Sequence, residues 1–196
     1  VQTIREVLDA DARALVVKER ELAHTLDLLK NKPNLVVTDS QVILKVAADV
    51  PDNIPLTTFS ILFARWKGDL ESFVQGADAI DKLKPGSKIL IAETCTHHPV
   101  ADDIGRVKIP RWLRQYVGGE LHFDHVAGMD FPDNLTDYSL IVQCGSCMTN
   151  RREVLRRIIQ AKSVGVPITN YGLCISKSLG VLHRALSPFP HLLKPI

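Results

Sequence analysis

Three cysteines and a histidine stand on two short segments, each of which directly follows an apolar run. Cys95 and His97 follow residues 88–92, whereas Cys144 and Cys147 follow residues 139–142. Both runs have the length and composition of buried strands. In an open α/β sheet, the loops at the carboxyl ends of the strands converge on one edge, where ligands bind. Thiol and imidazole groups gathered on such an edge predict a metal site.

The Cys144-x-x-Cys147 pair alone leaves three interpretations open: metal or cluster ligands, a thiol-redox pair, and two incidental thiols. It lies where a strand passes into a helix, whose N-terminus favours thiolates, and Gly145 is expected to allow the tight turn. Cys95-x-His97 on a second strand end favours the metal, because a redox pair needs no further ligands. Zinc would take all four residues as a tetrahedral set. An iron–sulfur cluster would take three thiolates and leave one iron for another ligand. The spacing does not separate the two metals.

The remaining candidates have plainer interpretations. Cys174 falls at the start of an apolar helical stretch and is expected to be a core thiol. His98 precedes a proline and is expected to shape the turn. His122 and His125 fall on opposite faces of a strand, which argues against a shared ligand role. Four arginines, at 151, 152, 156 and 157, are typical of a solvated helix face, although the first two oppose the helix dipole and so suggest an anionic partner.

Composition sets the broad class of protein. The 196 residues are 45% hydrophobic and 23% charged, with a net charge of +2, as in an ordinary globular protein. No apolar run is long enough for a membrane span and no signal peptide is visible, so the protein is expected to be cytoplasmic, without membrane contact. Four unevenly spaced cysteines fit a reducing compartment. Without an aromatic-basic motif, nucleic acid is not an expected partner. The chain begins at Val1 within a helical pattern, as a fragment would.

The first fifty residues predict a small parallel α/β unit. Apolar runs at 14–17 and 35–38 are typical of strands, and periodic patterns at 19–29 and 41–48 predict helices. Two strands cannot bury both faces of a sheet, so this unit is expected to pair with its copy in a homodimer. Two prolines within 50–55 indicate a linker. The predicted domains are therefore 1–52, for dimerisation, and 56–196.

The second domain alternates helical and strand patterns and predicts a doubly wound parallel sheet. After helices at 57–66 and 69–83, the expected strands are 88–92, 121–126, 139–142 and 166–170, and the expected helices are 102–116, 151–163 and 174–186. The fold class is therefore α/β throughout. No phosphate-binding loop, dinucleotide fingerprint or catalytic triad motif occurs, so no enzyme activity is expected of this stretch.

The chain resembles the F-type maturation GTPases of [FeFe]-hydrogenase (the HydF family), which carry C-x-H and, nearly fifty residues later, H-C-x-x-C. Here the motifs stand as Cys95-Thr96-His97 and Gln143-Cys144-Gly145-Ser146-Cys147. The likeness extends over 14–22, 37–42, 55–68, 102–113 and 167–172. It implies that the chain holds most of a dimerisation domain and a [4Fe-4S] domain, without the family's GTP-binding domain.

The resemblance also implies a function. Family members act as scaffolds that receive the precursor of the diiron subcluster from two radical-SAM maturases and transfer it to apo-[FeFe]-hydrogenase. The implied cluster ligands are Cys95, Cys144 and Cys147. The family's histidine before C-x-x-C is Gln143 here, and a glutamine is a poor iron ligand. The fourth iron position is therefore expected to fall to His97, to a carboxylate such as Glu93, or to water or cargo. From the residues alone, a thiol oxidoreductase using Cys144 and Cys147, or a zinc-stabilised interaction domain, remains the alternative.

Overall fold

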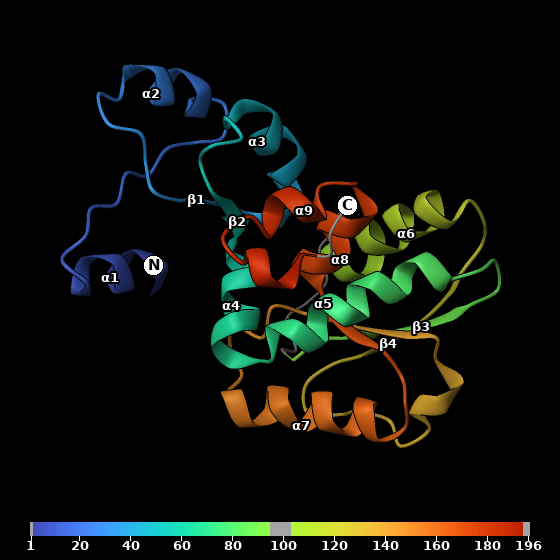
Figure 1. The fold of residues 1–196 in the computed structure, drawn as a ribbon. Coiled ribbons are helices and arrows are strands. Elements are labelled where there is room, and N and C mark those ends of the chain that lie inside the picture. The colour runs from blue at the N-terminus through green and yellow to red at the C-terminus, as the bar shows by residue number, and fades with distance from the viewer. Residues whose placement is uncertain (1, 95–102, 194–196) are drawn as a thin grey trace.

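The computed structural model describes residues 2–94 and 103–193 and is α/β, with all of its strand pairs parallel. Two sheets are present in the described ranges, one of two strands and one of four. In Figure 1, α5 and α8 lie over one face of the larger sheet and α7 lies below the other. The predicted fold class is therefore confirmed, including helices on both faces of the larger sheet.

The smaller sheet pairs β1 (Val36–Thr38) with β2 (Leu56–Thr58), joined through α3 (Ile43–Asp49). The prolines at 50–55, predicted to form a linker between domains, lie inside this crossover. The carbonyl of Pro55 accepts a hydrogen bond from the N–H of Val36 at 2.9 Å. The side chain of Arg184 also donates to the carbonyls of Pro51 and Ile54, at 2.9 and 2.7 Å.

The predicted strand at 14–17 is wrong, because these residues form no regular structure between α1 (Gln2–Asp9) and α2 (Leu22–Leu28). Leu15 and Val16 are 64% and 70% exposed. A strand exists only where a neighbouring strand takes up its backbone hydrogen bonds, and within residues 2–94 and 103–193 no strand lies there to do so. α1 lies well away from the four-stranded sheet (Figure 1).

Two capped helices lead from the smaller sheet to the larger one. The hydroxyl of Thr58 caps α4 (Phe59–Lys67), and the carboxylate of Asp69 caps α5 (Leu70–Asp78). A 3-10 turn at Ala79–Lys82 extends α5. α5 approaches β6 so closely that a Cβ on Gly76 would stand 1.9 Å from the carbonyl oxygen of Ile168.

The larger sheet has the order β4-β3-β5-β6. Its strands are β3 (Lys88–Ala92), β4 (His122–Val126), β5 (Leu140–Gln143) and β6 (Ile168–Asn170). The chain runs from β3 outward to β4, then returns to β5 on the other side of β3 and continues outward to β6. The direction of winding therefore reverses between β3 and β5, which is the topological switch point where open α/β sheets bind ligands.

Helices connect and cover these strands. α6 (Ile109–Val117) follows a π-helical turn at Ile104–Lys108, with Pro110 in its first turn, and joins β3 to β4. α7 (Arg151–Ser163) joins β5 to β6. The helix predicted at 174–186 forms as α8 (Tyr171–Ser178) and α9 (Leu182–Ala185), divided at Gly180, whose φ of +74° a helix does not permit. In the described part of the chain, every helix falls short of the length and apolar character needed to span a bilayer.

Candidate metal centre

The ends of β3 and β5 bring the two cysteine-bearing segments together. Ala92 and Gln143 are paired in register, and the N–H of Cys144 donates to the carbonyl of Ala92 at 3.0 Å. Glu93 and Thr94 continue from β3, directly beside the start of the Cys144–Cys147 loop. Adjacent strand ends in a parallel sheet therefore meet at the switch point, which is the arrangement that the sequence predicts for this edge.

Thr94 makes a direct contact with the thiol of Cys144. Its backbone N–H lies 3.3 Å from Sγ, and its hydroxyl Oγ1 lies 3.2 Å from the same atom. Hydrogen bonds to a ligand sulfur tune the reduction potential of an iron–sulfur cluster bound through it. Cys144 is half-buried and Cys147 is exposed, so the pair opens towards the surface at this edge.

Cys95, His97 and His98 lie outside the described residues, which resume at Asp103. Within 2–94 and 103–193, no three His, Cys, Asp or Glu side chains form a group that could hold a metal ion. Of the predicted ligands, the described residues include Cys144, Cys147 and Glu93, and these three side chains do not by themselves form such a group.

Gln143 and Ser146 determine the conformation of the C-x-x-C loop. The sequence suggested that Gly145 allows the tight turn, but the loop residue with a positive φ is Ser146, at +55°. The side-chain amide Nε2 of Gln143 donates to Oγ of Ser146 at 2.8 Å, and that hydroxyl donates to the carbonyl of Cys144 at 3.2 Å. Gln143 is fully buried. Its buried side chain therefore fixes the loop through the hydrogen bond to Ser146.

Glu93, the residue after β3, is buried, and both of its carboxylate oxygens have partners. Oε1 accepts a hydrogen bond from the hydroxyl of Tyr171 at 3.2 Å, and Oε2 lies 4.0 Å from the guanidinium of Arg106. Burial raises the pKa of Tyr171 far above its usual range, and the charges of Glu93 and Cys144 raise it further. Tyr171 therefore stays protonated and donates to this carboxylate.

Lys67, which the sequence did not single out, holds the C-x-x-C loop from α4. Its ammonium donates to the carbonyl oxygens of Ser146, Cys147 and Thr149 at 3.0, 3.0 and 2.9 Å. Arg151 makes the converse contact, since its guanidinium donates to the carbonyls of Trp66 and Gly68 at 2.7 and 3.0 Å. The positive charge of Arg151 is thus placed at the C-terminus of α4, and this corrects the expectation that it needs an anionic partner.

Arg157 was expected on a solvated face, and this is wrong. It is fully buried, donates to Glu153 Oε1 at 3.0 Å and to the carbonyl of Gly128 at 2.6 Å, and stands over the ring of Phe131. The prediction for Cys174 is confirmed: it is 1% exposed in α8, and burial raises its thiol pKa to about 12. Cys174 is therefore a core thiol.

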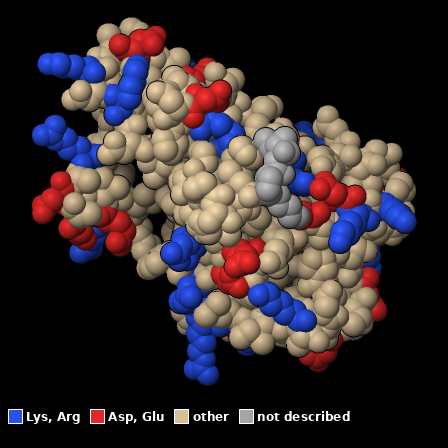
Figure 2. Space-filling model, in the orientation of Figure 1, with Lys and Arg blue, Asp and Glu red and all other residues tan. Residues whose placement is uncertain are grey.

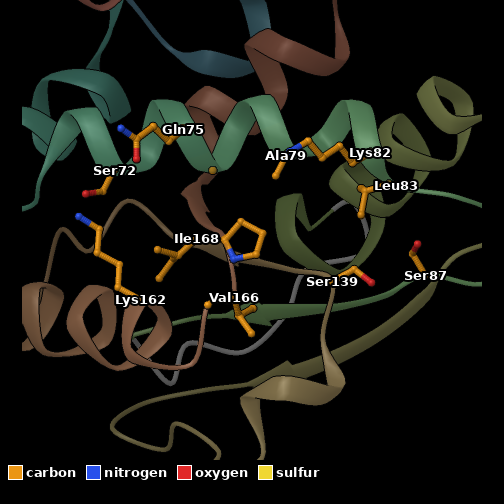
Figure 3. A pocket seen from close by; sticks show the side chains of 13 residues that line it. Ser72, Gln75, Ala79, Lys82, Leu83, Ser87, Ser139, Lys162, Val166 and Ile168 are labelled. Atoms are coloured by element: carbon orange, nitrogen blue, oxygen red, sulfur yellow. The ribbon is translucent and has the colours of Figure 1, made fainter.

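A cavity of about 560 Å³ lies at the opposite edge of the sheet, between α5 and the starts of the strands (Figure 3). Ser87, Ser139 and Val166, each close before a strand, line it together with Lys82 and Lys162. None of the described residues that line it is a cysteine or histidine. On the face drawn in Figure 2, basic and acidic side chains are interspersed, without the continuous basic stripe that nucleic acid favours.

Fold and strand-end thiols define an α/β protein with a candidate metal centre at its switch point. Comparison with protein families gives two matches: residues 71–188 match the hydrogen maturase F tetramerization domain, and residues 1–68 match the hydrogen maturase F dimerization domain. No curated protein matches the chain. Since the first match alone spans more than half of the sequence, the chain belongs to the hydrogen maturase F (HydF) family and has a role in hydrogenase maturation. Both matched domains are named for self-association.

Proposed function

We propose that this chain is a scaffold that holds a [4Fe-4S] cluster through Cys95, Cys144 and Cys147 during assembly of the diiron subcluster of [FeFe]-hydrogenase. The observation that carries the proposal is the contact between Thr94 and the Sγ atom of Cys144, at 3.3 Å from the backbone nitrogen. Thr94 immediately precedes Cys95 in the chain. Cys95, the third proposed ligand, is therefore the sequence neighbour of a residue that contacts Cys144.

The donor set suits an iron–sulfur cluster. Thiolates are soft ligands that favour such clusters, and Thr94 provides hydrogen bonds to one of the ligand sulfur atoms. The half-buried Cys144 and exposed Cys147 leave the site open on one side, as the bulk of a four-iron cluster requires. When bound, the cluster would supply one iron whose fourth ligand is not a cysteine and can be exchanged.

His97 is the favoured fourth ligand, with Glu93 as the alternative. Glu93 would have to give up the hydroxyl of Tyr171 and the guanidinium of Arg106 to bind iron. Gln143 is not assigned that role in this proposal, because a neutral amide is a poor iron ligand; its Nε2 donates to Ser146, and its buried Oε1 has no hydrogen-bond partner among the described residues. An imidazole binds iron less firmly than a thiolate does, so an incoming ligand can replace it.

The wider proposal follows the family. The chain works as a homodimer, accepts the diiron precursor as cargo from two radical-SAM maturases and passes it to apo-[FeFe]-hydrogenase. No phosphate-binding loop motif occurs in the sequence, so GTP is assigned to the family's separate GTP-binding domain. Support comes from the two family matches, whose names give both hydrogenase maturation and self-association.

Metal analysis after anaerobic purification and reconstitution tests the cluster. We expect about four iron and four acid-labile sulfide per chain, with a brown colour. Zinc without sulfide would instead favour an interaction domain. A Cys144–Cys147 disulfide that exchanges with thiols, in protein free of metal, would favour an oxidoreductase.

EPR of the reduced cluster tests the exchangeable position. Cyanide is expected to change the wild-type spectrum while iron and sulfide contents stay constant. The His97→Ala variant should show an altered spectrum before cyanide is added. A wild-type spectrum indifferent to cyanide would mean that the fourth position is closed, and cargo docking there would have to be abandoned.

A further inference from the structure

The ammonium group of Lys67 donates all three of its N–H groups to backbone carbonyls of the C-x-x-C loop and the residues that follow it. A lysine ammonium has three N–H groups and no acceptor, and the carbonyls of Ser146, Cys147 and Thr149 lie at 3.0, 3.0 and 2.9 Å from Nζ. These carbonyls belong to residues 79 to 82 positions away in the sequence. One side chain therefore fixes three peptide groups of a loop that belongs to a different part of the chain.

The surroundings of Lys67 hold its side chain in this position. Its ammonium lies 5.2 Å from the ring centroid of Phe63 and 5.4 Å from that of Trp66, within the range of cation–π attraction. Arg151, at the first position of α7, binds the carbonyls of Trp66 and Gly68 in return. The end of α4 and the start of α7 are thus joined by two cations, one from each helix.

The direction of these hydrogen bonds bears on the thiols. In a planar trans peptide the C=O and N–H bonds point in opposite directions. Because the carbonyls of Ser146, Cys147 and Thr149 face Lys67, the N–H groups of the same three peptides, at Cys147, Met148 and Asn150, face away from it. Lys67 thus leaves these N–H groups on the other side of their peptides, and a backbone N–H favours a nearby anion such as a cluster held by thiolates.

We propose that Lys67 is a positioning residue for the metal centre: it sets the C-x-x-C loop in its binding conformation before any metal arrives. This inference rests on the proposed function, because it assigns the pre-formed loop to cluster binding. It also links the two family matches, since Lys67 lies within residues 1–68 and the loop within residues 71–188. The part of the chain named for dimerization therefore helps to shape the metal site.

Hydrogen exchange of the full metal-free chain tests, without any cluster, whether Lys67 holds the C-x-x-C loop in place. In Lys67→Met, which keeps the aliphatic stem but loses the three donors, we expect the amides of residues 144–150 to exchange about tenfold faster than in wild type. Lys67→Arg should restore most of the protection, because it keeps the charge and several donors. Lys162→Met is the matched control, since Lys162 pairs with Asp69 and not with the loop, and it should exchange as wild type does there. Unchanged exchange in Lys67→Met would overturn the proposal.

If Lys67→Met does not fold, Lys67→Gln provides a second neutral variant. Exchange of the loop amides as slow as in wild type would, in that variant too, overturn the proposal that Lys67 holds the loop. In reconstituted protein, we expect Lys67→Met to lose its cluster to a chelator about tenfold faster than wild type, at a more negative reduction potential, with Lys67→Arg close to wild type. Equal loss rates and potentials would refute the assignment to the metal centre. If wild type binds no iron but Lys67→Met still speeds amide exchange in the loop, the proposed function fails, whereas the role of Lys67 in holding the loop is supported.

Discussion

The backbone N–H of Thr94 lies 3.3 Å from the Sγ atom of Cys144, with the Thr94 hydroxyl at 3.2 Å from the same sulfur. This contact joins the ends of β3 and β5 across the point where the winding of the sheet reverses. Thr94 therefore donates a hydrogen bond to the sulfur of one proposed cluster ligand, Cys144, and directly precedes another, Cys95, in the sequence.

Replacing Thr94 by valine should leave the cluster bound but make its reduction potential more negative. Hydrogen bonds to ligand sulfurs stabilise the more negatively charged, reduced cluster, and valine removes the hydroxyl while keeping the backbone N–H and the branched shape. A redox titration followed by EPR measures the potential. Thr94→Ser keeps the hydroxyl and should titrate as wild type does. A Thr94→Val potential equal to that of wild type would mean that the hydroxyl does not act on the sulfur.

Gly76→Ala should destabilise the fold by about 3 kcal/mol, the upper range for forcing a methyl group into a filled space. The new Cβ would stand 1.9 Å from the carbonyl oxygen of Ile168 and 2.9 Å from the backbone nitrogen of Thr169. Backbone atoms of a strand cannot turn aside, so α5 must move off β6. Urea denaturation of the metal-free chain measures the free energy of unfolding.

Gln75→Ala is the matched control for this substitution, because Gln75 directly precedes Gly76 in α5 but its side chain is exposed, and its loss should change stability by less than about 0.5 kcal/mol. If Gly76→Ala proved as stable as Gln75→Ala, the close approach of α5 to β6 would be incorrect.

The free energy of unfolding should fall in acid, in part through Glu153. The hydrogen bond from Arg156 and, less strongly, that from Arg157 lower the pKa of Glu153 below its ordinary value of 4.5. A carboxyl group whose pKa is lowered by folding stabilises the protein fully above pH 4.5, and this contribution is lost as the pH falls through the lowered value. Urea titrations of the metal-free chain at neutral pH and below pH 4.5 measure the effect.

The Glu153→Gln variant should be less stable than wild type at neutral pH and should lose less stability on acidification. A variant curve parallel to that of wild type would show that Glu153 makes no such contribution.

Val16→Asp should weaken self-association. Leu15 and Val16 are 64% and 70% exposed in a segment without a strand partner, and pairing with a second copy would cover them. A charge placed there would have to be desolvated on pairing. Sedimentation velocity should show a dimer for wild type and a shift towards monomer for Val16→Asp. Leu28→Asp, on the exposed side of α2, is the control and should remain dimeric; a dimer unaffected by Val16→Asp would place the interface elsewhere.

Much of this structure could be predicted from local sequence, because the deciding contacts are local. Thr58, Asp69 and Asn150 each cap a helix by accepting a hydrogen bond from an N–H three residues later, a pattern visible in the sequence. The order of apolar runs likewise predicts the parallel strands of the larger sheet and the strand ends that carry Cys144.

The failures involve partners far away in the chain. Residues 14–17 have the composition of a strand, but the part of the chain that the structure describes offers them no strand to pair with. Arg157 lies on a helix rich in charge, yet its carbonyl partner is Gly128 and its aromatic contact is Phe131. Lys67 reaches a loop about eighty residues away, at Cys147. Periodicity along one element does not indicate such contacts, since it registers the faces of the element and not what lies against them.

The three-cysteine site is tested most directly by the iron and acid-labile sulfide content of single cysteine variants, each reconstituted anaerobically beside wild type. Cys95→Ala, Cys144→Ala and Cys147→Ala should each lose the four-iron cluster, because each removes one of three thiolate ligands. Cys174→Ala should bind as much iron and sulfide as wild type, since Cys174 is 1% exposed in the core. Full cluster content in any one of the first three variants, or its loss in Cys174→Ala, would contradict the three-cysteine site.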